Sequence, residues 1–325
     1  MEIKDETKRI FWVEEKGKLK LNWIEKLLDK YQLDLSGLTV FTELATRDYF
    51  LAGFIPALAN AKKVYLYNED LFCGSNDPGS FFSQIEKTNS KDKMAEADII
   101  TNTGFVRPIT AQNVAMMKGT AIIALMMSKQ QIRPSDIDIF ACLGKGIELA
   151  ETDEINSGIL DSMGFKLLKV LFDSGLSVWN DRYLLLSAGL WSGYYERMLN
   201  NNGISYSKST FNHLKNFDAI IVANHDQVLN RDLLWIGADN DEQRSVISID
   251  RILKENPLIK IINISGNIDH STIFESGIDM YPNVKTKTGY SAVHGGYLGY
   301  KVVFEMMVAS LKAAERAVRG RLKQN

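Results

Sequence analysis

A turn of small residues between a strongly apolar strand and a helix restricts the fold of this chain more than any other feature. Residues 181–206 read DRYLLLSAGLWSGYYERMLNNNGISY. The run at residues 184–186 predicts a buried strand, residues 194–201 predict a helix that opens from the turn, and residues 204–207 predict a second strand. This order places the helix N-terminus, with its free N–H groups and positive dipole end, beside the carboxyl end of the first strand. It therefore predicts an α/β fold with a parallel sheet.

The turn itself is a variant of the glycine-rich turn that binds dinucleotides. In that turn the first glycine permits a tight bend, the second lets the backbone approach a pyrophosphate, and the third lets the helix pack on the strand. Ser187, Gly189 and Ser192 occupy these three positions here. Leu190 and Trp191 lie between the second and third, and the bulky Trp191 either covers a cofactor or closes the crevice. The turn predicts a Rossmann-like fold, with all five residues as candidate cofactor contacts.

The end of the next strand predicts which dinucleotide the fold takes. NAD-binding folds carry an acid there, about 20 residues after the turn, to hold the ribose diol. This strand ends Ser-Tyr-Ser-Lys-Ser-Thr at residues 205–210, with no carboxylate. Lys208, flanked by hydroxyls, can instead accept a 2′-phosphate, which favours NADP over NAD. The alternative is that no ribose binds there and Lys208 is a solvated loop residue.

Strands and helices alternate along most of the 325 residues, a length that exceeds what one hydrophobic core usually serves. Further strands are predicted at residues 38–41, 63–67, 98–102, 121–126, 219–223 and 259–264, and residues 137–142 close the first set. An amphipathic helix over residues 157–176 joins two similar halves. We therefore predict two tandem Rossmann-like, doubly wound α/β domains. Residues 1–156 form the substrate or partner side, and residues 157–325 form the dinucleotide-binding domain with a terminal helix at 301–319.

Composition excludes several classes of function. The net charge of −2 gives no electrostatic reason to bind nucleic acid or an acidic membrane. The longest apolar run, residues 121–127, is far shorter than the roughly 20 residues of a spanning helix. No secretory signal is recognisable, and two separated cysteines make neither a disulfide framework nor a zinc site. The sequence thus predicts a cytoplasmic protein, without metal, that acts on a small molecule, and fold size favours a homodimer.

Polar residues that follow predicted strands are further candidates, because ligands of open α/β sheets bind beyond the carboxyl ends of strands. Asn224 and His225 follow the strand at 219–223, and Ser265 and Gly266 follow the strand at 259–264. We expect Asn224, Ser265 and Gly266 to contact the cofactor. Capping of the following helices is the alternative role for a strand-end residue such as Asn224.

Candidate catalytic residues are few, because the chain has only four histidines. His294 lies in the glycine- and aromatic-rich segment YSAVHGGY at residues 290–297, and His225 lies at a strand end. Either can serve as the acid/base of a hydride-transfer reaction. Arg107 can clamp a substrate carboxylate with two hydrogen bonds, or it can form a surface ion pair.

Several segments resemble two known families. Residues 98–126 (DIITNTGFVRPITAQNVAMMKGTAIIALM), residues 218–234 (DAIIVANHDQVLNRDLL) and the helix that leads into LLLSAGLWSG are similar to segments of S-adenosylhomocysteine hydrolases and D-2-hydroxyacid dehydrogenases. The resemblance covers roughly residues 95–270 and implies a nicotinamide cofactor, NADP or NAD. It favours an NAD(P)-dependent oxidoreductase that acts on a small polar metabolite in an interdomain cleft. Two alternatives stay open: a Rossmann-like binding or regulatory protein with a degenerate or empty cofactor site, and a nucleotide-utilising transferase.

Overall fold

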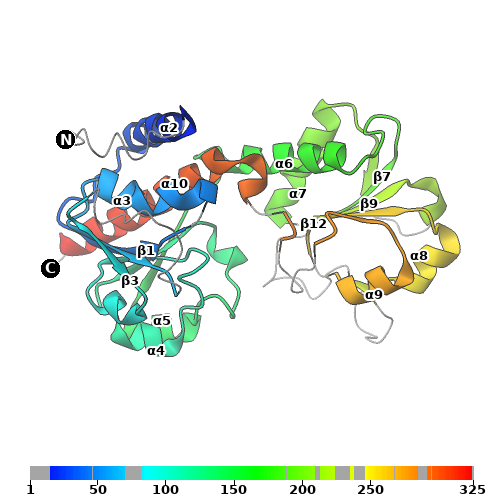
Figure 1. Ribbon diagram of the computed structural model, residues 1–325. Helices are drawn as coiled ribbons and strands as arrows, with labels where there is room; N and C mark the ends of the chain where they lie inside the picture. Colours follow the sequence, from blue (N-terminus) through cyan, green and yellow to red (C-terminus); the bar gives the residue numbers. More distant parts are fainter. Residues whose placement is uncertain are drawn as a thin grey trace. The chain divides into compact units, whose positions relative to one another are not determined.

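The computed structural model divides the chain into two compact units. The first contains Met1–Ser157 and Tyr300–Asn325, and the second contains Gly158–Gly299. The structure describes residues 15–45, 47–69, 82–187, 189–208, 213–223, 235–237, 246–266, 268–284, 291–293 and 295–323. Both units are α/β, as the sequence predicts (Figure 1).

The first unit is built on a parallel sheet of six strands in the order β3-β2-β1-β4-β5-β6. This is the 3-2-1-4-5-6 order of a complete dinucleotide-binding fold. The strands are β1 (Thr39–Glu43), β2 (Lys63–Tyr67), β3 (Ile85–Thr88), β4 (Ile99–Thr101), β5 (Ile122–Leu125) and β6 (Glu148–Glu151). The helices are α2 (Glu15–Tyr31), α3 (Ile55–Leu58), α4 (Ala111–Met116), α5 (Ile139–Lys145) and α10 (Tyr300–Leu322), with 3-10 turns η2 (Arg47–Phe54), η4 (Lys91–Ala95) and η5 (Lys129–Gln131).

Both faces of this sheet are covered, which explains why its central strands, such as β4 and β5, are largely apolar and buried. Alternate residues of a strand point to opposite faces. Val40 and Ile122 therefore join the core beneath α2, α3 and α10, whereas Phe41 and Ile123 join the core beside α4 and α5. Figure 1 shows these two groups of helices on opposite sides of the sheet. Continuous apolar strands of this kind are typical of parallel sheets.

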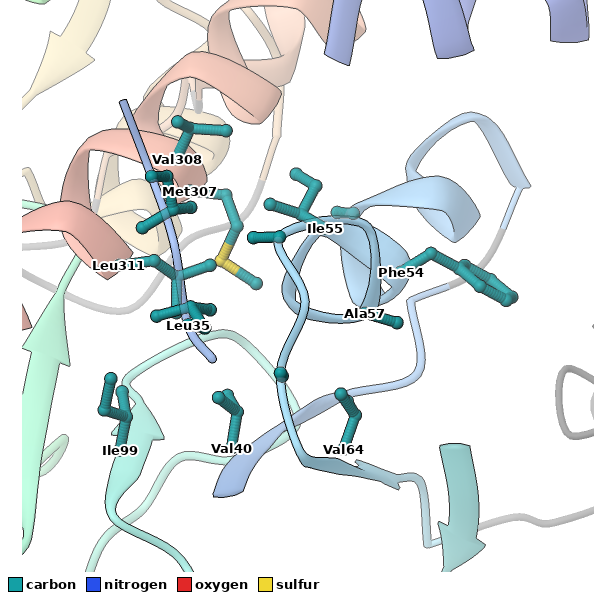
Figure 2. Packing of buried hydrophobic residues seen from close by; sticks show 14 of the residues in the cluster. Leu35, Val40, Phe54, Ile55, Ala57, Val64, Ile99, Met307, Val308 and Leu311 are labelled. Atoms are coloured by element: carbon teal, nitrogen blue, oxygen red, sulfur yellow. The ribbon is translucent and has the colours of Figure 1, made fainter. Parts of the chain in front are cut away.

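The terminal helix α10 belongs to the first unit, which corrects the predicted assignment to the second domain. Met307, Val308 and Leu311 lie in the same buried cluster as Val40 and Ile99 of the first sheet. Figure 2 shows these side chains facing one another between α10 and the strands. The chain therefore returns to its first unit after completing the second. The helix was predicted correctly, but its apolar stripe does not specify which sheet covers it.

The second unit contains a parallel sheet of five strands in the order β13-β12-β9-β7-β8. The strands are β7 (Tyr183–Leu186), β8 (Tyr206–Lys208), β9 (Ala219–Ala223), β12 (Lys260–Ser265) and β13 (Met280–Tyr281), and β10 (Trp235–Gly237) pairs separately with β11 (Val246–Ser248). The helices are α6 (Ile159–Asp173), α7 (Gly189–Asn201), α8 (Ile249–Glu255) and α9 (His270–Ser276), with 3-10 turns η6 (Leu214–Asn216) and η7 (Gly295–Leu298).

Helices α6 and α7 pack together on one face of the second sheet. Leu167 and Tyr195 share a core with Leu185 and Ile221, while Leu184 and Ile220 join the opposite core. Close approach of the two helices depends on Gly164, because a Cβ there would lie 2.7 Å from Met198 Cε. The strand order changes direction at β7, which lies between β8 and β9. This switch point is where open α/β sheets bind ligands.

Apolar segments were predicted well and polar ones poorly. The strands at 63–67 and 219–223 have the bounds that the sequence predicts. Strands β3 and β6 were missed because their sequences, IEKT and ELAE, lie at sheet edges and carry charged residues. Residues 137–142, which were expected to close the first set, instead contribute to α5.

Candidate functional site

The turn that follows β7 lies at the switch point of the second sheet. Helix α7 begins at Gly189, with Leu190 in its first turn, so its N-terminus stands beside the end of β7. Ser187 Oγ donates a hydrogen bond to the carbonyl oxygen of Ala223, at 2.8 Å. This bond links the ends of β7 and β9 across the switch point. The sequence prediction of a strand, a turn and a helix in this order is confirmed.

The Trp191 side chain is only 3% exposed and belongs to the core beneath α6 and α7. Its two predicted roles, covering a cofactor or closing the crevice, stay predictions. Gly193, on the other side of Ser192, is exposed, and a Cβ there would meet no atom within 4 Å. In the first two turns of α7, the position of Trp191 is therefore buried, whereas the position of Gly193 is open.

A hydrogen-bonded network connects the turn to the end of β8. Ser192 Oγ donates to Glu196 Oε1 at 2.8 Å and also contacts the carbonyl oxygen of Ser187 at 3.4 Å. Lys208 Nζ lies 2.5 Å from the same Glu196 Oε1. Burial by itself would raise the pKa of Glu196, but the hydrogen bonds from Lys208 and Ser192 outweigh it and hold the pKa below its usual value. Glu196 is thus a charged partner of Lys208.

Glu196 was not among the residues predicted for this site. The usual position of a ribose acid is the end of the second strand, where Lys208 stands. Glu196 follows Ser192 by one helical turn, and helical side chains lean toward the N-terminus of their helix. This spacing of one helical turn after Ser192 was the signal in the sequence that could have identified Glu196.

The other predicted cofactor residues of the second unit lie farther along the sheet edge. Ser265 ends β12, which is separated from β7 by β9. Ser265 is buried and forms an antiparallel bridge with Ser291. Gly266 has a φ of +152°, and a Cβ there would lie 2.8 Å from Val222 Cγ1. Gly266 therefore serves local packing, and its contact with a cofactor stays a prediction.

Three predicted residues, Asn224, His225 and His294, lie outside the described part of the chain. Hydrogen bonds fix the backbone of Val293, the residue before His294. The carbonyl oxygen of Val293 accepts hydrogen bonds from Lys166 Nζ at 2.9 Å and from Ser291 Oγ at 2.7 Å.

A second group of polar residues gathers at the switch point of the first sheet, between β1 and β4. Glu43 ends β1, and its Oε2 accepts a hydrogen bond from the backbone N–H of Phe105 at 2.9 Å. A Cβ at Gly104 would lie 3.4 Å from the same oxygen, so the loop passes close to this carboxyl group. Burial raises the pKa of Glu43 and outweighs the effects of the Phe105 N–H and the Arg107 charge, which lower it. Glu43 was not among the predicted site residues.

Arg107 lies in the same loop and already has a partner. Its Nη1 is 3.2 Å from Asp136 Oδ2, and its side chain is 28% exposed. This geometry matches the ion pair considered as one of its two roles. A role as a substrate clamp stays a prediction, because the planar guanidinium carries further N–H donors beyond the one that faces Asp136.

The described residues contain no group of three or more His, Cys, Asp or Glu arranged to hold a metal ion. Within the same part of the chain, no helix is both long enough and apolar enough to cross a membrane.

The fold has counterparts among solved structures. A dipicolinate synthase chain from Bacillus subtilis is 12% identical, with a TM-score of 0.53 over 89% of this chain and 99% of that one. A dipicolinate synthase chain from Bacillus halodurans is also 12% identical, with a TM-score of 0.54 over 88% and 98%. D-lactate dehydrogenase with NAD+ from Lactobacillus jensenii is 11% identical, with a TM-score of 0.50 over 87% and 97%. The chain shares the fold of these proteins.

This finding confirms the predicted pair of Rossmann-like domains. D-lactate is a D-2-hydroxy acid, so one of the two family resemblances seen in the sequence recurs in the structure. No family model matches the chain, and no curated protein sequence matches it either. At these identities the similarity carries the fold and not the substrate.

Proposed function

We propose that this protein is an NAD(P)-dependent oxidoreductase that acts on a small polar metabolite. The observation that carries the proposal is the second unit's switch point, where α7 begins at Gly189 beside the end of β7. A helix N-terminus in this position is suited to a pyrophosphate, because its N–H groups are free and its dipole end is positive. In dinucleotide-binding folds the adenosine ribose lies at the end of this strand, so the ion pair at the end of β8 supports the proposal. These residues fit the adenosine half of a dinucleotide.

The chain's own residues have distinct roles in this proposal. A bound nicotinamide dinucleotide supplies or accepts the hydride. Gly189 lets the phosphates approach the backbone, and Ser187 and Leu190 border that approach. His294 or His225 moves the proton that accompanies the hydride, and Arg107 orients a carboxylate of the substrate. The proposal also includes contacts of Asn224, Ser265 and Gly266 with the cofactor. It further includes a homodimer, and light scattering measures the oligomeric state directly.

Thermal shift in the presence of NAD, NADP and S-adenosylmethionine tests the proposal. A ligand at 100 times its Kd stabilises the folded protein by about 2.7 kcal/mol. We expect one or both dinucleotides to raise the Tm and S-adenosylmethionine to leave it unchanged. A shift by S-adenosylmethionine alone would favour a transferase, and no shift with either dinucleotide would refute the oxidoreductase.

A pair of variants locates the site. Gly189→Val should abolish the dinucleotide-dependent shift, because its side chain blocks the approach of the phosphates. Gly193→Val is the matched control, since a Cβ at this exposed position of the same helix meets no atom within 4 Å. An undiminished shift in Gly189→Val would place the dinucleotide elsewhere in the protein.

One observation favours a second candidate, a regulatory or binding protein with an empty cofactor crevice. The Ser187 hydroxyl already joins the ends of β7 and β9, where a glycine would leave the space free. Ser187→Gly distinguishes the two functions. In an oxidoreductase it preserves or strengthens dinucleotide binding, whereas in a protein with a closed crevice it creates binding that the original chain lacks.

A further inference from the structure

A carboxylate from a neighbouring helix lies at the end of β8, although the strand itself contains no acidic residue. In a dinucleotide fold the adenosine ribose lies at this point, and an acid on the strand accepts hydrogen bonds from its two hydroxyls. The strand offers Lys208, but Glu196 reaches the same place from α7, with its Oε1 2.5 Å from Lys208 Nζ. A carboxylate from the neighbouring helix therefore lies beside the end of the strand.

The carboxylate is held in a defined orientation. Lys208 Nζ and Ser192 Oγ both approach Oε1, and among the described residues no hydrogen bond is made to Oε2. Ser192 also contacts the carbonyl oxygen of Ser187, so the network starts at the turn that would bind the pyrophosphate. The Glu196 side chain is 28% exposed, so it is fixed by its partners and still open to a ligand.

Charge decides which ribose this arrangement suits. One ammonium and one carboxylate sum to zero, so the pair presents no net positive charge to a phosphate. The hydroxyls of an unmodified ribose can donate to the free oxygen of Glu196, and hydrogen bonds to an ionised acceptor are the stronger kind. A 2′-phosphate would instead meet the negative Glu196 and would have to draw Lys208 away from it.

We propose that Glu196 is the ribose-binding acid of the second unit and that it makes the protein prefer NAD to NADP. The inference rests on the proposed function, since it assumes that a nicotinamide dinucleotide binds at this switch point. It reverses the preference for NADP that Lys208 suggests in the sequence. Lys208 orients Glu196 and does not serve as a receptor for phosphate.

Dissociation constants for NAD and NADP, measured by calorimetry on the full chain, test this assignment. The unaltered protein should bind NAD more tightly than NADP. Glu196→Gln removes the charged acceptor and releases Lys208, and the ratio of the two Kd values should shift toward NADP by about tenfold or more. Lys208→Gln keeps the acid and should preserve the preference for NAD. Glu275→Gln, the same change at an exposed residue of α9, is the control and should leave the ratio unchanged.

The possible outcomes separate the two proposals. Tighter binding of NADP by the unaltered protein overturns the assignment of Glu196 without using any variant. A Kd ratio that changes no more in Glu196→Gln than in Glu275→Gln overturns it as well. If neither dinucleotide binds the unaltered protein, the proposed function itself fails. A melting curve for each variant shows whether it is folded, so a lost structure is not mistaken for a changed preference.

Discussion

The pH dependence of unfolding tests the burial of Lys166 in the second unit. This lysine lies on α6, is only 3% exposed, and donates a hydrogen bond to the carbonyl oxygen of Val293. Burial lowers its pKa from 10.5 to about 8. A buried ammonium is costly because it has lost its hydration.

The shift in pKa determines both the sign and the size of a pH effect. Between pH 8 and pH 10.5 the unfolded chain keeps a proton on Lys166 that the folded chain has released. Stability rises with pH wherever the unfolded state binds more protons, so the free energy of unfolding increases across this window. The cost of burying the charge is present in full below pH 8 and disappears above pH 10.5. Its total is about 3 kcal/mol, of which about 2 kcal/mol is recovered between pH 7 and pH 9.5.

Denaturant unfolding at pH 7 and pH 9.5 measures this effect when the protein is compared with Lys166→Met. The variant has no titrating group at this position, so the difference in unfolding free energy between the two proteins should change by about 2 kcal/mol between the two pH values. The comparison cancels the other titrations and any constant loss from the hydrogen bond to the Val293 carbonyl. Lys254→Met, at an exposed position of α8, is the control and should change in parallel with the original protein.

A difference that does not depend on pH would refute the reasoning. It would mean that the Lys166 ammonium is hydrated in solution and that α6 does not pack over it as the structure describes. An effect of opposite sign, with the original protein losing stability relative to the variant as the pH rises, would indicate an acidic partner for Lys166.

Three glycines give further predictions, each measured as a change in the free energy of unfolding. Gly266→Ala should destabilise the protein by about 1–3 kcal/mol, because φ is +152° and the new Cβ would lie 2.8 Å from Val222 Cγ1. Gly193→Ala, on an exposed face of α7 with no atom within 4 Å of the new Cβ, should stabilise it by about 0.5–1 kcal/mol. Gly164→Ala should cost about 1 kcal/mol net, since contact with Met198 outweighs the gain in helix propensity. Equal effects at Gly266 and Gly193 would contradict the described backbone.

The sequence predicted the parts of this protein that local chemistry determines. Apolar runs such as residues 219–223 fit only a sheet covered on both faces, and that pattern is complete within a few residues. The small residues that follow β7 likewise predicted a turn that leads directly into a helix. These features require no knowledge of distant segments.

Tertiary structure decided the rest, because it depends on which segments become neighbours. The apolar stripe of α10 fits either sheet, and only packing against residues such as Val40 assigns it to the first unit. The polar segments β3 and β6 are strands because they pair with β2 and β5 at the two edges of the sheet.

The proposed cofactor site shows the same division most clearly. The sequence determined the turn after β7 and the lysine that ends β8, and those two features alone favoured NADP. Pairing of β8 with β7 brings Lys208 beside α7, where Glu196 neutralises it. The net charge of a site is the sum of the charges that the fold brings together. Here the two charges lie on a helix and on the strand that follows it, and they become neighbours only when that strand pairs with β7.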